Sequence, residues 1–479
     1  MKKTPFDIKT IHFIGIGGIG MSGIAEILIS QGYDVQGSDI AENANILRLR
    51  EKGARVNIGH SPKNIICPDD TTISAIVISS AVKQDNPEII AARDARVPIV
   101  KRADMLAELM RHKWSIAIGG THGKTTTTSM VGTMLETGGI DPTIVNGGIV
   151  NAYGTNARPG KGEWFVAEAD ESDGSFTRLP ATIAVVTNID PEHMDHYGDF
   201  SNMQAAYRTF VNNLPFFGFA VLCTDHPEVQ GLIPHLNDRK ILTYGFNPQA
   251  DVRAVNIRQT PNGSEFDVVC GDVTIKDIYL PMLGQHNVQN SLASIAIALE
   301  LSMPIALIKK GMSEFQGVKR RFTKTGEVSG ISIIDDYGHH PVEISAVLKA
   351  GRQAVEDSNG KIIAVMQPHR YTRLQDLFED FSTCFNEADT VIIADVYPAG
   401  EKPIDGINKE ALAQSIRTHG HKDVHVLEEP NDLALLINDI ACSGDYVICL
   451  GAGNITAWAN SLPNKLSKIS NNKIGIKNL

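Results

Sequence analysis

Short apolar runs alternate with stretches of helical periodicity along most of the 479-residue chain. Runs of this length, rich in β-branched residues and separated by amphipathic stretches, predict βαβ units and largely parallel sheets. The pattern forms three successive blocks, so the expected fold class is α/β with three domains. We place the domains at residues 1–108, 109–316 and 317–479.

The individual elements follow from the same pattern. In the first block we expect strands at 11–16, 35–38, 75–79 and 97–100, and helices at 20–31 and 103–111. The second block predicts strands at 114–118, 164–167 and 181–186, helices at 125–136 and 288–301, and antiparallel hairpins over 253–280. The third predicts strands at 331–335, 361–366, 390–394 and 445–450 with helices between them. The last dozen residues are expected to form a loose tail.

Composition and charge narrow the choice of partners. The 44 basic and 55 acidic residues give a net charge of -11, which opposes general attraction to nucleic acid or anionic membranes. No run reaches the roughly 18 apolar residues that a membrane span requires, and the N-terminus lacks the apolar region of a signal peptide. The 6 cysteines contain no C-x-x-C pair and are expected to be reduced and buried. We expect a cytoplasmic monomer or homodimer.

A glycine-rich loop carries the strongest chemical signal. Gly120-Thr-His-Gly-Lys-Thr-Thr126 lies between an apolar run and a predicted helix. Glycines let backbone N–H groups approach phosphate oxygens, Lys124 can reach the β and γ phosphates, and Thr125 can bind Mg²⁺. The loop is a shortened form of the full G-x-x-x-x-G-K-[ST] pattern, because Ile118 stands where that pattern has its first glycine. A glycine-rich turn with a solvated lysine is the alternative.

A second glycine-rich turn, Gly15-Ile-Gly-Gly-Ile-Gly20, follows the first predicted strand and opens a helix. This fingerprint is typical of dinucleotide binding, although the pyrophosphate of a nucleotide sugar can occupy the same helix N-terminus. Asp39 ends the next predicted strand, where its carboxylate can accept from a ribose hydroxyl or cap a turn.

Carboxylates and imidazoles follow two strands of the second block. Val166-Ala-Glu-Ala-Asp-Glu-Ser-Asp173 supplies acids suited to Mg²⁺, with a solvated acidic loop as the alternative. The next strand leads to His193, Asp195 and His196. These three side chains also fit a transition-metal site in a hydrolase.

Further polar motifs stand at element boundaries. Asn287 and Asn290 share the first turn of a predicted helix, where they either bind a nucleotide or cap the helix. The basic run Gly317-Val-Lys-Arg-Arg-Phe322 lies at a domain boundary and is either part of a site or a solvated turn. Ile334-Asp-Asp-Tyr-Gly-His-His-Pro341, Gln367-Pro-His-Arg-Tyr-Thr-Arg373 and Gly451-Ala-Gly-Asn-Ile455 each follow a predicted strand of the third block.

These motifs, in this order, resemble those of the Mur ligases of bacterial peptidoglycan synthesis over nearly the whole chain, and most closely those of the alanine-adding members. The resemblance implies a Rossmann-like N-terminal domain for the UDP moiety of UDP-N-acetylmuramate. It further implies a central P-loop ATPase-like domain for ATP and Mg²⁺, and a doubly wound C-terminal domain that brings L-alanine. The implied reaction passes through an acyl phosphate on the lactyl carboxylate and releases ADP and phosphate.

The resemblance also implies roles for individual residues. The expected catalytic residues are Lys124, Arg321, Asp336 and His340, where His339 is the other candidate for the base that deprotonates the amine. ATP is expected at Gly120, Thr121, His122, Gly123, Lys124, Thr125, Thr126, Asn287 and Asn290, and the metal at Thr125, Glu168 and His193. The other substrates are expected at Gly15, Gly17, Gly18, Gly20, Asp39, His369, Arg370 and Arg373.

One departure from the family concerns a second metal ion. Several related ligases carry a lysine, carbamylated for metal binding, downstream of the histidine motif. Between His193 and Leu214 this sequence has Arg208 and no lysine, a feature shared with the alanine-adding members. A second ion is therefore not assigned.

Other functions remain open at this point. A dinucleotide-dependent oxidoreductase would use Gly15 to Gly20 but leaves Lys124 unexplained, and a metallohydrolase would use His193, Asp195 and His196. A non-enzymatic module would bind ATP without turnover. Within the family, the nearest alternative is the recycling ligase that attaches a whole tripeptide to UDP-N-acetylmuramate.

Overall fold

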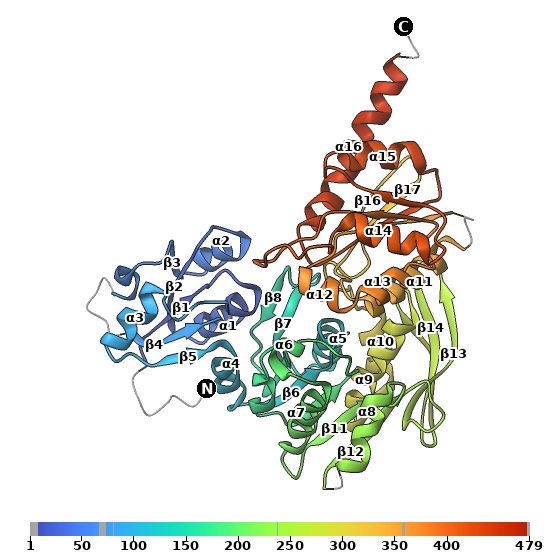
Figure 1. Cartoon of the computed structure of the whole chain (residues 1–479). Helices are drawn as coiled ribbons and strands as arrows, with labels where there is room; N and C mark the ends of the chain where they lie inside the picture. The colour runs from blue at the N-terminus through green and yellow to red at the C-terminus, as the bar shows by residue number, and fades with distance from the viewer. Residues whose placement is uncertain (1–7, 67–72, 80, 237, 357–359, 477–479) are drawn as a thin grey trace. The chain divides into compact units, whose positions relative to one another are not determined.

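The computed structural model of the chain describes residues 8–66, 73–79, 81–236, 238–356 and 360–476 (Figure 1). The chain divides into two compact units. The first contains Met1–Ile257, Phe266–Leu280 and Gln289–Gly317, and the second contains Arg258–Glu265, Pro281–Val288 and Val318–Leu479, in each case as far as the described residues extend. Three sheets run through these units.

The first sheet is a five-stranded parallel sheet with strand order β3-β2-β1-β4-β5. This order begins the classical dinucleotide-binding arrangement, in which ligands lie at the carboxyl ends of the central strands. Its elements are β1 (Thr10–Ile14), α1 (Ile19–Ser30), β2 (Asp34–Asp39), α2 (Ala44–Glu51), β3 (Arg55–Ile58), β4 (Ile73–Ile78), α3 (Pro87–Asp94), β5 (Ile99–Lys101) and α4 (Arg102–Met110).

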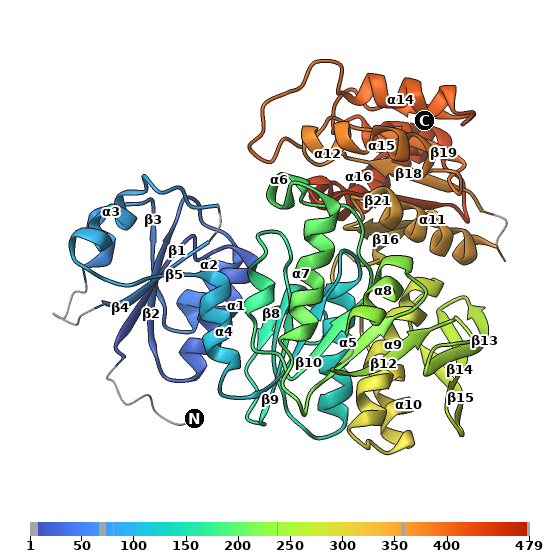
Figure 2. The same ribbon diagram turned by 60° about the horizontal axis from the view of Figure 1, so that its bottom comes forward.

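Both faces of the first sheet are covered by helices (Figure 2). Phe13 of β1 is fully buried in a core that includes residues of α1, α2 and α4. Ile14, the next residue, packs in a separate core with Ile89 of α3. Successive side chains of a strand point to opposite faces, so an apolar run without alternation indicates a strand buried on both sides.

The second sheet has ten strands in the order β15-β14-β13-β12-β11-β10-β6-β9-β7-β8. Strands β6, β9, β7, β10, β11 and β12 are parallel neighbours, and β8 is antiparallel to β7. Its elements are β6 (Trp114–Gly119), α5 (Lys124–Thr137), β7 (Thr143–Val150), β8 (Thr155–Arg158), β9 (Trp164–Glu168), β10 (Ile183–Val186), α6 (Met194–Tyr197), α7 (Phe200–Asn212), β11 (Phe219–Cys223), α8 (Pro227–Leu232), β12 (Lys240–Gly245), β13 (Val252–Thr260), β14 (Gly263–Cys270), β15 (Val273–Leu280), α9 (Gln285–Glu300) and α10 (Ile305–Ser313).

The third sheet has six strands in the order β16-β17-β21-β18-β19-β20, all parallel except β16 at the edge. Separate cores cover its two faces. Its elements are β16 (Thr323–Val328), β17 (Ile331–Asp336), α11 (Pro341–Val355), β18 (Ile362–Met366), α12 (Tyr371–Asp376), α13 (Phe378–Thr383), β19 (Thr390–Ile393), α14 (Lys409–Thr418), β20 (Val424–Val426), α15 (Leu433–Ile440), β21 (Tyr446–Leu450) and α16 (Ile455–Ile476).

Two expectations from the sequence were wrong. The predicted loose tail is largely the end of α16, which continues to Ile476. The cysteines are not uniformly buried, because Cys442 is exposed and Cys270 is half-buried, while Cys67 lies outside the described residues. Among the helices that the structure describes, none has the length and apolar character needed to cross a membrane.

Candidate active site

The loop 120–123 connects the buried strand β6 to helix α5 and depends on two glycines with positive φ. Gly120 has φ +130° and Gly123 has φ +82°. A Cβ atom at Gly120 would lie 2.0 Å from Oγ1 of Thr187, and one at Gly123 would lie 2.6 Å from Oδ1 of Asn290. Both the backbone conformation and the lack of space therefore require glycine.

Residues that follow β10 hold this loop in place. The backbone N–H of His122 donates to Oδ1 of Asn188 at 2.7 Å, and the hydroxyl of Thr187 donates to the carbonyl of His122 at 2.6 Å. The Thr121 hydroxyl accepts from the Asp190 N–H at 2.9 Å. Helix α5 has no side-chain cap at Gly123, so its N-terminus keeps the polarity that binds anions.

The Lys124 side chain lies within this loop rather than in solvent. Its Nζ donates to the carbonyls of Gly120 at 2.6 Å and Thr121 at 3.0 Å, and lies 2.8 Å from the carboxylate of Glu171. Burial lowers the pKa of Lys124, but the charges of Glu171 and Glu168 outweigh this effect and raise it above its usual value. The ammonium group is thus charged at neutral pH and held against the carbonyls of the loop.

Glu168 and Thr125, two of the predicted metal ligands, are in direct contact. The Thr125 hydroxyl donates to Oε2 of Glu168 at 3.0 Å, and the backbone N–H of Gly147 donates to the same oxygen at 2.8 Å. Glu168 is the last residue of β9, next to β6 in the sheet. The parallel strands therefore place this carboxylate beside the start of α5.

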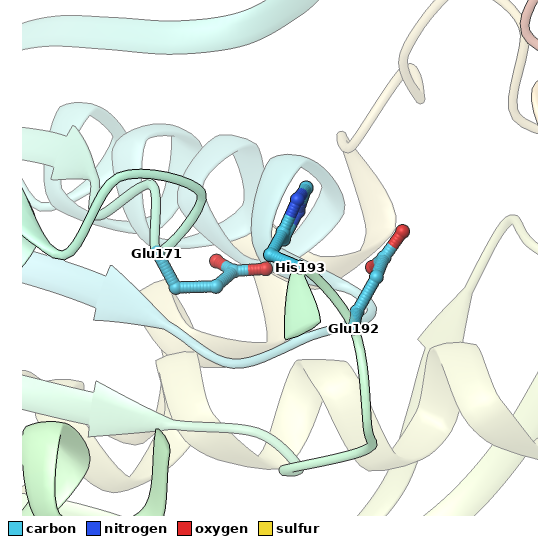
Figure 3. Close-up of side chains that lie close together, drawn as sticks. All are labelled: Glu171, Glu192 and His193. Atoms are coloured by element: carbon cyan, nitrogen blue, oxygen red, sulfur yellow. The ribbon is translucent and has the colours of Figure 1, made fainter. Parts of the chain in front are cut away.

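His193, the third predicted ligand, lies with two other acids. Ligand atoms of Glu171, Glu192 and His193 all lie within 4.8 Å of one another, and Figure 3 shows the Glu171 carboxylate directed toward the segment that carries the other two. Two carboxylates and an imidazole suit a divalent cation. Burial raises the pKa of Glu171 to about 7 against the effect of Lys124.

The set proposed for a metallohydrolase is not the one that the structure brings together. In the described part of the chain, the grouping around His193 contains Glu171 and Glu192 but neither Asp195 nor His196. His196 is exposed, and its Nε2 lies 2.9 Å from the Cβ position of Gly174. These neighbours favour an oxygen-rich site over a histidine-rich one.

The glycine-rich turn after β1 is built as the sequence predicts, but Asp39 is engaged with it. Oδ2 of Asp39 accepts from the backbone N–H of Gly17 at 2.8 Å, and Oδ1 accepts from that of Ile40 at 2.8 Å. Gly15 has φ +79°, and Gly18 is the N-cap of α1 without a side-chain cap. Of the two roles open for Asp39, the structure displays the fixing of a turn.

The two asparagines lie near the start of α9 and have different surroundings. Asn290 is buried with its Oδ1 against Gly123, in the first unit. The amide of Asn287 donates to the carbonyl of Leu283 at 2.8 Å, in the second unit. Asn290 thus packs against the loop 120–123, whereas Asn287 fixes the segment before the helix.

In the second unit, Asp336 and Arg321 lie near the amino end of α11. Asp336 is buried, and its carboxylate accepts from the backbone N–H groups of Phe322 and Gly338, each at 2.7 Å. Burial raises the pKa of Asp336 to about 6. The guanidinium of Arg321 lies over the Tyr337 ring, 5.4 Å from its centre, and 3.9 Å from the Glu343 carboxylate.

The two candidate bases have different surroundings. His340 is buried and caps α11, because its Nδ1 accepts from the Val342 N–H at 3.4 Å. His339 is less buried, and its ring centre lies 6.0 Å from that of His369. His369 in turn stacks on Tyr397, and burial together with His339 and nearby arginines lowers its pKa to about 4.

Arg370 and Arg373 accompany His369 at the carboxyl end of β18. Arg373 donates from Nη1 to the His369 carbonyl at 3.3 Å. Arg370 is exposed and has φ +72°, an uncommon conformation for a residue with a side chain. Neutral His369 and two arginines form a basic group suited to a carboxylate.

Several neighbours of the site were not singled out from the sequence. Asp190 lies 3.3 Å from both His122 and His226, which hold its pKa well below its usual range despite burial. His286 is a second neutral histidine, with a pKa lowered to about 4 by burial and by Arg321. Such pairings join distant parts of the sequence, and no local spacing reveals them.

Comparison with known proteins gives matches over nearly the whole chain. Models of three domains match in sequence: the Mur ligase family catalytic domain at residues 10–114, the Mur ligase middle domain at 118–298, and the Mur ligase glutamate ligase domain at 320–453. A UDP-N-acetylmuramate--L-alanine ligase of Rhodospirillum centenum is 60% identical over 475 residues, which cover 98% of this chain and 97% of that protein.

Solved structures agree with these sequence matches. The UDP-N-acetylmuramate-alanine ligase of Thermotoga maritima has a TM-score of 0.81 at 30% identity and covers 96% of this chain and 99% of its own. A murein peptide ligase of Psychrobacter arcticus has a TM-score of 0.68 at 21% identity, covering 96% and 98%, and shares the fold.

Proposed function

The chain belongs to the Mur ligase family, and on this premise we propose that it joins L-alanine to the lactyl carboxylate of UDP-N-acetylmuramate with hydrolysis of ATP to ADP and phosphate. The observation that carries the proposal is the 60% identity, over nearly all of both chains, to a ligase named for these two substrates. The reaction forms a C–N bond and supplies a precursor of peptidoglycan in the cytoplasm.

In the first step the lactyl carboxylate attacks the γ-phosphorus of ATP, the bond from this phosphorus to the bridging oxygen breaks, and an acyl phosphate and ADP form. Negative charge on the phosphoryl oxygens rises in this step, and the charged Nζ of Lys124 lies at the loop that would hold them. The uncapped N-terminus of α5 adds positive potential along the same direction. These groups are in place before the reaction, so little reorganisation accompanies it.

In the second step the amine of L-alanine attacks the acyl phosphate, and the tetrahedral intermediate collapses to an amide and phosphate. The amine must lose a proton before it attacks. His339 and His340 stay the candidates for the base, and the cap that His340 provides to α11 favours His339. His369, Arg370 and Arg373 are proposed to hold the alanine or muramyl carboxylate, and Arg321 and Asp336 to act on the ATP side.

The residues around His193 fit Mg²⁺. Glu171, Glu192 and His193 lie together, and Thr125 with Glu168 lies at the adjoining start of α5. Bound there, Mg²⁺ would neutralise phosphate charge. Lys124 lies 2.8 Å from Glu171, so its ammonium group already balances part of the negative charge of these acids.

A coupled assay of ADP release tests the proposal. The full chain is mixed with ATP, Mg²⁺ and UDP-N-acetylmuramate, and each of L-alanine, glycine, L-serine and the cell-wall tripeptide is added in turn. ADP release that depends on both the sugar nucleotide and L-alanine is the expected result. A rate that is the same without an amino acid contradicts the proposal, and preference for the tripeptide identifies the recycling ligase instead.

An oxidoreductase would need a different cofactor. It requires binding of a nicotinamide or flavin cofactor at Gly15 to Gly20 and no ATP. The match of a family domain to residues 118–298, which include Lys124, leaves that alternative without support. The domain boundaries after residues 108 and 316 and the monomeric or dimeric state stay proposals.

A further inference from the structure

Arg102, the first residue of α4, lies against the glycine-rich turn of the first sheet. A Cβ atom at Gly20 would be 3.1 Å from Cδ of Arg102 and 3.4 Å from its Nη1. Helices α1 and α4 are in contact in the structure, and Figure 2 shows them side by side. The guanidinium therefore lies beside the first turn of α1.

A cation at this place is unfavourable without an anion. The N-terminus of α1 carries a partial positive charge, has no acidic residue in its first turn and has no side-chain cap. An arginine next to it adds like charge.

Asp170 supplies the anion in the structure. Its Oδ2 lies 3.0 Å from Nη2 of Arg102, and its Oδ1 accepts from the Ser172 N–H at 3.0 Å. The Asp170 side chain is 43% exposed, so a dissolved anion can compete with it for the guanidinium.

We propose that Arg102 binds the diphosphate of the sugar nucleotide at the N-terminus of α1, and that Asp170 is the anion that the diphosphate displaces. The inference rests on the proposed function and adds a binding residue to it. A guanidinium can donate two parallel hydrogen bonds to a phosphate, which an ammonium group cannot.

The exchange connects two sites of the first unit. Asp170 stands between Glu168, which contacts Thr125, and Glu171, which contacts Lys124. When the diphosphate binds Arg102, the Asp170 carboxylate loses its cationic partner. The loop that carries these acids then has one more uncompensated negative charge. Occupancy of the sugar-nucleotide site thereby favours a cation in the ATP site, and by linkage the reverse holds.

A second ion pair in the same region provides a matched control. Arg178 lies 3.0 Å from Asp104 of α4, so this pair also joins α4 to the segment that follows β9. Asp104 stands two residues beyond Arg102. The atoms nearest to the Cβ position of Gly20 all belong to Arg102, and Arg178 is not among them.

Calorimetric titration of the full chain with UDP and with uridine tests the proposal. Replacing Arg102 with Ala should weaken UDP binding by at least about tenfold, the loss expected for a charge-assisted hydrogen bond, and leave uridine binding unchanged. Arg102→Lys should recover part of the loss. Asp170→Asn should tighten UDP binding, because it removes the competing anion, whereas damage to the fold would weaken it. Arg178→Ala should change neither affinity.

The outcomes separate this inference from the proposed function. Equal losses of UDP and uridine affinity in Arg102→Ala, or weaker UDP binding in Asp170→Asn, would overturn it. A steady-state assay adds a second readout, since Arg102→Ala should raise the KM for UDP-N-acetylmuramate more than the KM for ATP. A wild-type chain that binds UDP but releases no ADP with L-alanine contradicts the proposed function, while the titrations still decide the role of Arg102.

Discussion

A lysine as enclosed as Lys124 keeps its charge only where acids lie beside it. Burial alone would lower its pKa, and Glu171 at 2.8 Å reverses that effect. The Nζ also contacts the carbonyls of the loop itself. The carbonyls of the loop thus fix the position of the Lys124 side chain, and Glu171 keeps it charged.

Replacing Lys124 with Ala tests this placement. We expect ADP release to fall by about two to three decades, the range found when a charge-stabilising donor is removed. Lys113→Ala is the matched control, because Lys113 also donates to backbone carbonyls, those of Gly160 and Gly162. That control should lower the midpoint of thermal unfolding and leave turnover per folded molecule near the wild-type value. Near-normal ADP release by Lys124→Ala would mean that the phosphate site lies elsewhere.

At the scale of residues, the sequence predicted where the motifs stand in the fold better than it predicted their contacts. The spacing of Lys124 and Thr125 after an apolar run was sufficient to place them at the start of the helix that follows β6, and phosphate binding there stays a prediction. The residue pattern alone did not distinguish among Glu168, Asp170 and Glu171, and only the family resemblance singled out Glu168. The structure directs the three acids to Thr125, Arg102 and Lys124 respectively. Consecutive residues in a loop point in directions that depend on distant partners.

At the scale of elements, the turn between β6 and α5 depends on its glycines in two separable ways. Gly120→Ala introduces both an unfavourable φ and a Cβ 2.0 Å from Thr187. Gly139, just after α5, has φ +77° with no atom within 4 Å of the Cβ position. We expect Gly139→Ala to cost about 1 kcal/mol of unfolding free energy from the backbone alone, and to leave ADP release unchanged.

Gly120→Ala should lose more stability than Gly139→Ala and should also lose most of its ADP release, because the loop must shift away from Thr187. Denaturant unfolding measures the first effect and the coupled assay the second. Equal unfolding free energies for the two variants would show that the contact with Thr187 relaxes without cost.

Glu88 of α3 contacts strands β1 and β2 of the first sheet and the segment that follows β3. Its carboxylate lies 2.8 Å from His12 of β1 and accepts from the hydroxyl of Ser38 of β2 and from the amide of Asn64. Burial raises the pKa of Glu88, but these contacts outweigh it and lower the pKa from 4.5 to about 2. The acid is fully buried and charged.

The sign of the pH dependence follows from the lowered pKa. The stabilisation that ionised Glu88 provides is complete above about pH 4.5 and is lost as the pH falls toward 2. Its size is roughly 3 kcal/mol, from the difference between the two pKa values. Urea unfolding of wild type and Glu88→Gln should therefore differ at pH 7 and converge in acid. A constant difference across this range would assign the effect to packing instead of charge.

The elements themselves were largely predictable where strands are buried on both faces. The runs at 114–118 and 445–450 correspond to β6 and β21, because continuous apolar runs have few alternatives in parallel sheets. The hairpin of β7 and β8 was not predicted. Its residues Asn146, Gly147 and Asn156 are of types that are uncommon in strands, and contacts such as that of Gly147 with Glu168 explain their presence in a strand.

At the scale of the whole molecule, the division into two compact units predicts that unfolding is not a single cooperative transition. The glycine-rich turn of β1 and α1 belongs entirely to the first unit. UDP contains the uridine and diphosphate that this turn is proposed to bind and lacks the muramyl group. It should therefore stabilise the first unit alone.

Differential scanning calorimetry with and without UDP checks this expectation. At a free concentration about 100 times its Kd, a ligand that binds only the folded form adds about 2.7 kcal/mol to the stability of its own unit. We expect two overlapping transitions, one of which moves to higher temperature with UDP while the other stays. Equal shifts of both would show that the units unfold as one. Because the second unit contains Asp336 and His369, independent unfolding would also show that these groups keep their arrangement without the nucleotide.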